Sequence, residues 1–84
     1  MELIRNHFYS AKRRQYIGLC DMLNDRQILH IGLDSVQYDS PTVRDGRHFP
    51  TVTKERFLRW AMDDVTDKMP KDGGWREKKG DDIP

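Results

Sequence analysis

The chain has 84 residues, 36% of them hydrophobic and 35% charged, which is enough for one small domain and too little for two separate cores. Fifteen lysine and arginine residues oppose fourteen aspartate and glutamate residues, so the formal net charge is +1. These totals exclude most enzymes that build a large pocket of their own, and they do not indicate a strongly basic nucleic-acid binder.

The number of cysteines and the hydropathy pattern further limit the class of protein. Cys20 is the single cysteine, so the chain has neither an internal disulfide nor the paired thiolates of a structural zinc site. The longest mostly apolar run, residues 28–33, is far shorter than the ~20 residues of a membrane span. The N-terminus has no apolar signal region. We therefore expect a soluble, cytoplasmic protein that does not contact membranes.

Residues 11–23 are compatible with two kinds of element. The apolar run at residues 16–23 fits a strand that pairs with the next run across a turn at Asn24 and Asp25. A helix also remains open, with Ser10 as its cap, because four side chains of the run would share one face: Tyr16, Leu19, Cys20 and Leu23. We favour the strand, since Gly18 inside a helix costs about 1 kcal/mol.

Two further extended segments are expected downstream. Residues 29–38 alternate between apolar and polar side chains, which predicts a strand with a bend or bulge near residues 32–35. The residues Arg44-Asp45-Gly46 have the character of a turn. They predict a second, short hairpin between residues 42–43 and 48–49.

The clearest element is an amphipathic helix over residues 54–69. Thr53 can cap its first turn, Asp64 and Lys68 form an acid-before-base pair four residues apart, and Pro70 prevents continuation. The apolar side chains fall within roughly 140° of one another when they are projected on a helix. They are Phe57, Leu58, Ala61, Met62, Val65 and Met69.

These elements predict an α+β domain at residues 2–69, made of a small antiparallel sheet of two hairpins and closed by one C-terminal amphipathic helix. A barrel-like closure of the sheet is left open. Residues 70–84 contain two prolines, three glycines and eight charged side chains. We expect a charged, flexible tail there, because it buries too little surface to offset its ordering entropy.

Patterns for catalysis, for a metal or for a cofactor are not found. His7, His30 and His48 lack the spacing of metal ligands, and no nucleophile signature surrounds Cys20, for which a small buried apolar role is expected. The chain also has no glycine-rich phosphate loop and no nucleophile elbow. We expect a protein that is not an enzyme and that carries neither metal nor cofactor.

Local charge is less balanced than the total. Up to residue 20 the chain carries four basic residues and one acid, Glu2. Lys12, Arg13 and Arg14 form a basic run with aromatic residues on both sides of it, a combination that suits a phosphate backbone and its bases. The run is equally compatible with ordinary solubilising charge.

Arg44 and Arg47 form a second basic cluster at the expected turn, and an arginine-rich hairpin tip can lie along phosphates. Residues 40–49 and 54–61 resemble the wing and last helix of phage excisionase-type winged-helix proteins, with Val43-Arg44-Asp45-Gly46-Arg47 at the turn and Glu55 followed by Trp60 in the helix. The resemblance implies DNA binding and bending, with both arginines on the wing. That family places a helix-turn-helix before the wing, where residues 14–38 of this chain predict strands.

Two functions from different classes follow. The first is an accessory protein, of the kind that phages or mobile elements encode, which binds a DNA or RNA backbone through Lys12, Arg13, Arg14, Arg44 and Arg47. The second is a protein interaction module or inhibitor that occupies a partner's surface, with Trp60 and Trp75 as candidate anchors. An edge strand of a small sheet also allows a homodimer.

Overall fold

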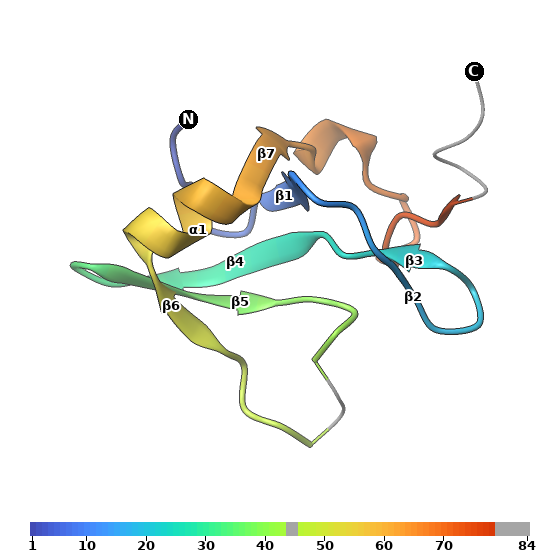
Figure 1. The fold of residues 1–84 in the computed structure, drawn as a ribbon, viewed down its shortest axis with the longest axis horizontal. Helices are drawn as coiled ribbons and strands as arrows, with labels where there is room; N and C mark the ends of the chain where they lie inside the picture. The colour runs from blue at the N-terminus through green and yellow to red at the C-terminus, as the bar shows by residue number, and fades with distance from the viewer. Residues whose placement is uncertain (44–45, 79–84) are drawn as a thin grey trace.

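The computed structural model describes residues 1–43 and 46–78, which form seven strands, an α-helix and a 3-10 helix (Figure 1). In chain order they are β1 (Phe8–Ala11), β2 (Tyr16–Ile17), β3 (Met22–Leu23), β4 (Arg26–Ile31), β5 (Ser35–Asp39), β6 (Thr51–Thr53), α1 (Lys54–Trp60), β7 (Ala61–Asp64) and the 3-10 helix η1 (Thr66–Lys68). None of the helices in these residues has both the length and the apolar character that crossing a bilayer requires.

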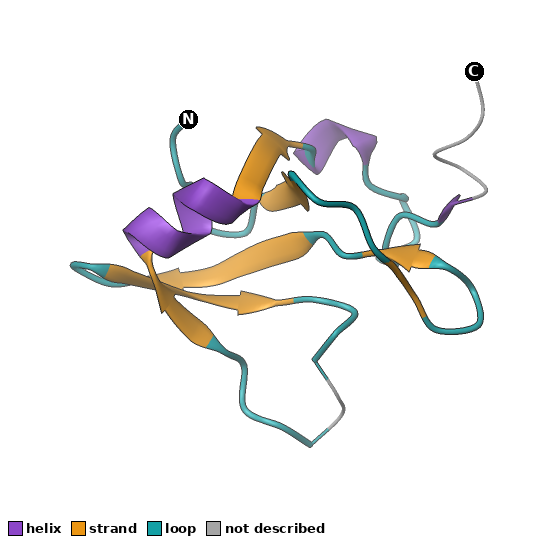
Figure 2. Cartoon of the chain, viewed as in Figure 1, coloured by secondary structure: helices purple, strands orange, loops and turns teal. Residues whose placement is uncertain are grey.

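Five strands form one antiparallel sheet in the order β6-β5-β4-β1-β7, and β2 and β3 form a separate two-stranded ribbon. Helix α1 lies over one face of the larger sheet (Figure 2). The expected α+β class and the small antiparallel sheet are therefore confirmed. The barrel-like closure is wrong, because β6 and β7 end the sheet on opposite sides and do not pair with each other.

The strand expected over residues 29–38 is in fact a hairpin. Strands β4 and β5 pair with each other, with Ile31 opposite Val36. The Gly32 N–H donates to the Ser35 carbonyl at 2.8 Å and closes the turn between them, and Leu33 at its tip is 91% exposed. An apolar residue at the turn kept the alternating pattern unbroken, so the sequence showed a bend where the chain reverses.

Residues 16–23 are extended at both ends of the run, as favoured over the helix, but their partner is different from the one expected. Strands β2 and β3 pair with each other, with Tyr16 opposite Leu23, instead of pairing with the next run. Gly18 and Asp21 both have positive φ, at 75° and 51°, which lets the chain reverse inside the run. Cys20 lies in this reversal and is exposed, so its expected buried role is wrong.

The second hairpin is only partly matched. Strand β5 pairs with β6, with Val36 opposite Val52, so the partner strand begins after the expected residues 48–49. Residues 42–43 and 48–49 belong to the connection between these strands. Arg44 and Asp45, at the centre of the expected turn, lie outside the described residues.

The helix expected over residues 54–69 ends at Trp60. Its start is confirmed, because Thr53 Oγ1 accepts a hydrogen bond from the Arg56 N–H at 3.1 Å. At Ala61 the backbone becomes extended, and β7 pairs with β1, so that Ala61 lies opposite Ala11. Residues 63–67 are Asp, Asp, Val, Thr and Asp, all modest helix formers. Up to Val65 the backbone pairs with β1 instead, and Thr66 begins the 3-10 helix.

The core is an aromatic cluster between α1 and the sheet. The Phe57 ring meets the edge of Tyr9 at 5.5 Å between centroids and that of Tyr38 at 6.1 Å, and it tilts against Trp60 at 5.2 Å. Ile28, Val36 and Ala61 complete the buried set. Aromatic pairs in this edge-to-face arrangement contribute about 0.5–1.5 kcal/mol each beyond the area they bury.

The C-terminal segment returns to the ribbon (Figure 1). The Leu23 N–H donates to the Arg76 carbonyl and the Lys78 N–H to the Asp21 carbonyl, both at 2.8 Å. Trp75 meets the ring edge of Phe8 at 5.5 Å. The division into a domain of residues 2–69 and a tail stays a prediction, and residues 79–84 lie outside the described residues.

Arg76 also forms a bidentate ion pair with Asp25. Its Nε lies 2.7 Å from Asp25 Oδ2 and its Nη2 lies 2.9 Å from Oδ1, while only 2% of the Asp25 side chain is exposed. A carboxylate buried to this degree needs its partner, because an unpaired charge there is strongly unfavourable. The pair therefore links the C-terminal segment to the start of β4.

The first prediction concerns the core. Replacing Phe57 by Ala removes the ring that three other rings contact, and we expect the free energy of unfolding to fall by about 3–5 kcal/mol in urea denaturation. Leu58→Ala, on the exposed side of the same helix, is the control and should cost far less. Equal losses for the two variants would contradict the packing described.

The second prediction concerns the buried ion pair. Asp25→Leu and Arg76→Met should each lower the free energy of unfolding by roughly 3–5 kcal/mol, because each removes one half of a buried, bidentate ion pair. The double variant should lose less than the sum of the two. Strict additivity in this double-mutant cycle would show that the pair does not couple the C-terminal segment to β4.

Candidate anion-binding site

Arg26 is a charged residue at a position that faces the core. It begins β4 directly opposite Tyr9 of β1. Because side chains alternate along a strand, Arg26 and the fully buried Ile28 project from the same face of the sheet. The arginine therefore extends over the end of the aromatic cluster.

The guanidinium group of Arg26 lies between two aromatic rings. Its Cζ is 4.2 Å from the centroid of Tyr38 and 4.0 Å from that of Trp60. Phe57 is more distant, at 5.9 Å. Contacts of a cation with ring faces at this distance are attractive, and the two contacts restrict where the guanidinium can lie.

The positive charge of Arg26 is not neutralised within the described part of the chain. None of its guanidinium nitrogens donates to a described acceptor, and no described carboxylate pairs with it. Burial lowers the pKa of Arg26, Tyr38 acts in the opposite direction, and Arg56 lowers it again. Arginine keeps its proton at neutral pH in any case, so a partly buried cation without a counter-ion remains.

A hollow of about 270 Å³ opens beside this group, and we call it the arginine hollow. It has room for a phosphate group and several waters, since each water takes ~30 Å³ of liquid volume. None of the described residues that line it is acidic. They are Arg13, Gln15, Asn24, Arg26, Ser40, Thr42 and Trp60.

A second hollow adjoins the first through Thr42, which lines both. This loop hollow lies in the connection between β5 and β6 and is also lined by Val43, Arg47, His48 and Pro50. Its described lining again includes no carboxylate. We call these two hollows, whose linings include Arg13, Arg26 and Arg47, the basic strip.

The expected run Lys12, Arg13 and Arg14 is divided by the fold. Arg13 lines the arginine hollow, whereas Lys12 and Arg14 line another hollow, beside Lys68 and Asp63. The Lys12 N–H donates to the Trp60 carbonyl at 2.9 Å, which holds the run against the end of α1. The structure thus brings Arg13 and Arg47 to one strip and places Lys12 and Arg14 elsewhere, while Arg44 lies outside the described residues.

The two tryptophans expected as partner anchors are both half-buried. Trp60 packs against Phe57 and carries the Arg26 guanidinium over its ring. Trp75 contacts the edge of Phe8. Both rings thus have partners within the chain.

Sequence reasoning missed Arg26, because residues 24–25 were assigned to a turn that ended the alternating pattern. The alternation of Leu29 and Ile31 with His30 would place Arg26 on the polar side. The register shift between Ile28 and His30 puts Ile28, and with it Arg26, on the core side, where a charged residue is unusual. Its partners, Tyr38 and Trp60, come from segments that only the folded chain brings together.

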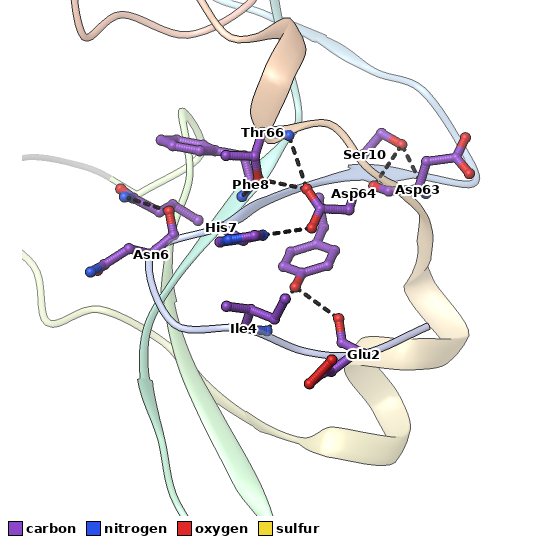
Figure 3. A network of polar contacts seen from close by, with 11 residues as sticks. Glu2, Ile4, Asn6, His7, Phe8, Ser10, Asp63, Asp64 and Thr66 are labelled. Carbon is purple, nitrogen blue, oxygen red and sulfur yellow. Dashed lines mark hydrogen bonds and ion pairs between the residues drawn. The ribbon is translucent and has the colours of Figure 1, made fainter.

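A separate polar network joins His7 and Asp64 (Figure 3). The His7 Nδ1 donates to Asp64 Oδ2 at 2.7 Å, and Asp64 Oδ1 accepts from the Thr66 N–H at 3.0 Å. The Thr66 hydroxyl oxygen in turn accepts from the Phe8 N–H at 3.0 Å. These contacts fasten the start of β1 to the end of β7, which is a structural role.

The third prediction follows from the carboxylate in that network. Burial alone would raise the pKa of Asp64, but the hydrogen bonds from His7 and Thr66 outweigh it and hold the pKa below its ordinary value. A carboxylate whose pKa is lowered by folding stabilises the protein at pH values above its ordinary pKa, about 3.9. That stability is lost as the pH falls through the pKa of the folded state.

Asp64→Asn should therefore show a shallower loss of unfolding free energy than the parent as the pH falls from about 5 to 2, measured by urea denaturation at each pH. Asp67→Asn, an exposed carboxylate in η1, is the control and should follow the parent. Identical pH profiles for the parent and Asp64→Asn would contradict the role assigned to the network.

The basic strip is thus a pair of adjoining hollows with three arginines, one of them stacked between two rings, and without a carboxylate in the described lining. Comparisons with protein-family models, with curated proteins and with solved structures find no match for this chain. What the protein does is therefore inferred from the geometry and charge of this strip.

Proposed function

We propose that the protein is a non-enzymatic accessory protein that binds the phosphate backbone of nucleic acid through the basic strip. One observation carries the proposal: the arginine hollow and the loop hollow share the lining residue Thr42, and the described lining of each contains arginine and no carboxylate. Phosphate contacts of this kind supply most of the affinity of non-specific nucleic-acid binding. A local strip is sufficient for this, although the whole chain is nearly neutral.

The strip favours contact with the backbone over reading of bases. Arg13, Arg26 and Arg47 would donate to phosphate oxygens, which positions a strand without distinguishing its sequence. Trp60, the aromatic residue of the strip, already has Arg26 over its ring and Phe57 against it. Little ring surface is left for a base to stack on, so weak sequence preference is expected.

The resemblance to excisionase-type winged-helix proteins remains part of this proposal. It would place Arg44 and Arg47 on a wing beside DNA, and the loop hollow contains Arg47. Residues 14–38 form strands and turns where that family has a helix-turn-helix. We therefore propose an accessory protein of the phage or mobile-element type that binds the backbone and does not place a recognition helix in the major groove.

A protein partner is the second candidate, and exposed leucines favour it. Leu19 at the reversal of the ribbon and Leu33 at the turn between β4 and β5 are both almost fully exposed. Exposed apolar side chains at loop tips are available to a partner's surface. The edge strands β6 and β7 would also allow a homodimer.

The fourth prediction tests the proposed function by fluorescence anisotropy of a labelled oligonucleotide, single-stranded and duplex. Binding should weaken steeply between about 50 and 200 mM salt, with a slope of log K against log salt of roughly −2 to −3 for three phosphate contacts. The double variant Arg13→Gln/Arg47→Gln should bind more weakly and lower the magnitude of that slope by about 1 to 2.

Arg59→Gln/Lys71→Gln is the matched control, because both side chains are exposed and line neither hollow, and the change in net charge is the same. It should retain the slope of the parent. Absence of binding by either oligonucleotide at about 50 mM salt, or equal effects of the two double variants, would contradict the proposed function.

A further inference from the structure

Arg26 differs from the other cations of the chain in how it is held. It is partly buried, it lies between Tyr38 and Trp60, and no described acidic group faces it. Arg76, another partly buried arginine, is paired with Asp25. A cation that a protein partly buries without a counter-ion is best stabilised by an anion from outside.

We infer that the arginine hollow is a binding site for a single phosphate-class oxyanion, held by Arg26 between its two rings and by Arg13 from the opposite segment. The oxyanion would be one phosphate of a strand if the proposed function holds, and a free phosphate compound otherwise. Only the source of the anion rests on the proposed function; the chemistry of the site does not.

The ring sandwich determines how Arg26 can bind. The Arg26 Cζ lies over both the Tyr38 ring and the Trp60 ring, while the N–H donors of a guanidinium point outward within its own plane. A phosphate accepts two such donors side by side, in the bidentate geometry that a planar guanidinium provides. Because the two ring contacts already restrict the Arg26 side chain, less side-chain entropy is lost when an anion binds.

The rest of the lining supplies a second cation and neutral donors. Arg13 comes from the loop after β1, whose backbone is held in place because Asn24 Nδ2 donates to the Arg13 carbonyl at 3.2 Å. Thr42 offers a hydroxyl, which lies 3.0 Å from the Ser40 hydroxyl. Two cations and a hydroxyl around a hollow of about 270 Å³ suit one oxyanion better than a larger ligand.

The fifth prediction tests this site with inorganic phosphate as the probe. Trp60 and Trp75 are the two tryptophans of the chain, so in a Trp75→Phe background the fluorescence reports on Trp60 alone. Phosphate should change that fluorescence along a saturable curve, whereas chloride at the same ionic strength should not. Phosphate should also displace a bound oligonucleotide more effectively than chloride does.

Three variants locate the site. Arg26→Lys keeps the charge and removes the planar fork, and it should weaken phosphate binding by about tenfold or more. Arg13→Gln should weaken it without disturbing the ring sandwich. Arg59→Lys is the matched control for the first variant and should leave binding unchanged. If Arg26→Lys does not fold, as judged by its far-UV circular dichroism, the result for Arg13→Gln decides.

The outcomes separate this inference from the proposed function. Saturable phosphate binding without oligonucleotide binding supports the site and contradicts the proposed function. The site is overturned if neither Arg26→Lys nor Arg13→Gln weakens oligonucleotide binding and phosphate does not change the fluorescence of Trp60. In that case other cations of the chain bind the backbone. Equal responses to phosphate and chloride also overturn it, because they indicate screening alone.

Discussion

The packing of the Phe57 ring between helix and sheet is the contact on which the rest of the structure depends. Helix α1 has seven residues, too few to be stable alone, so its position depends on what it buries. It buries Phe57 against Tyr9 and Tyr38, which belong to β1 and β5. The same contact places Trp60, one turn further along the helix, over the end of the sheet. The start of β4, β5 and the end of α1 therefore meet at one point.

Arg26 lies at that meeting point and connects the core to the surface. Its guanidinium extends the aromatic cluster by one more planar layer, between Tyr38 and Trp60. The layer is charged, and the hollow beside it has no described carboxylate. The elements that stabilise the core thus also orient the group proposed to bind phosphate. Nucleic-acid binding by this protein would then depend on one preorganised arginine supported by Arg13 and Arg47, and not on the basic run alone.

The sequence predicted local features well and long-range pairing poorly. The α+β class, the cap at Thr53 and the buried ring of Phe57 all followed from residue type and spacing. The prediction that the helix continues beyond Trp60 was wrong. Ala61 and Val65 are four residues apart, so they face the core both in a helix and in the extended segment that pairs with β1. Strand partners could not be predicted from the alternation, because the alternation is the same whichever strand pairs with it.

The site residues divide in the same way. Arg13 was identified from local charge, whereas the environment of Arg26 depends on rings that lie 12 and 34 residues away in the sequence.

Arg26, in contact with two rings, is thus proposed as the phosphate-binding group of this surface. Its role can be followed by NMR of the arginine side-chain Nε–Hε resonances, titrated with inorganic phosphate and then with an oligonucleotide. We expect one resonance to have a ring-current shift and to be absent in Arg26→Lys. This resonance should move first, along a saturable curve, with both ligands. Movement of the resonances of Arg14 and Arg59 with an unchanged Arg26 resonance would contradict it.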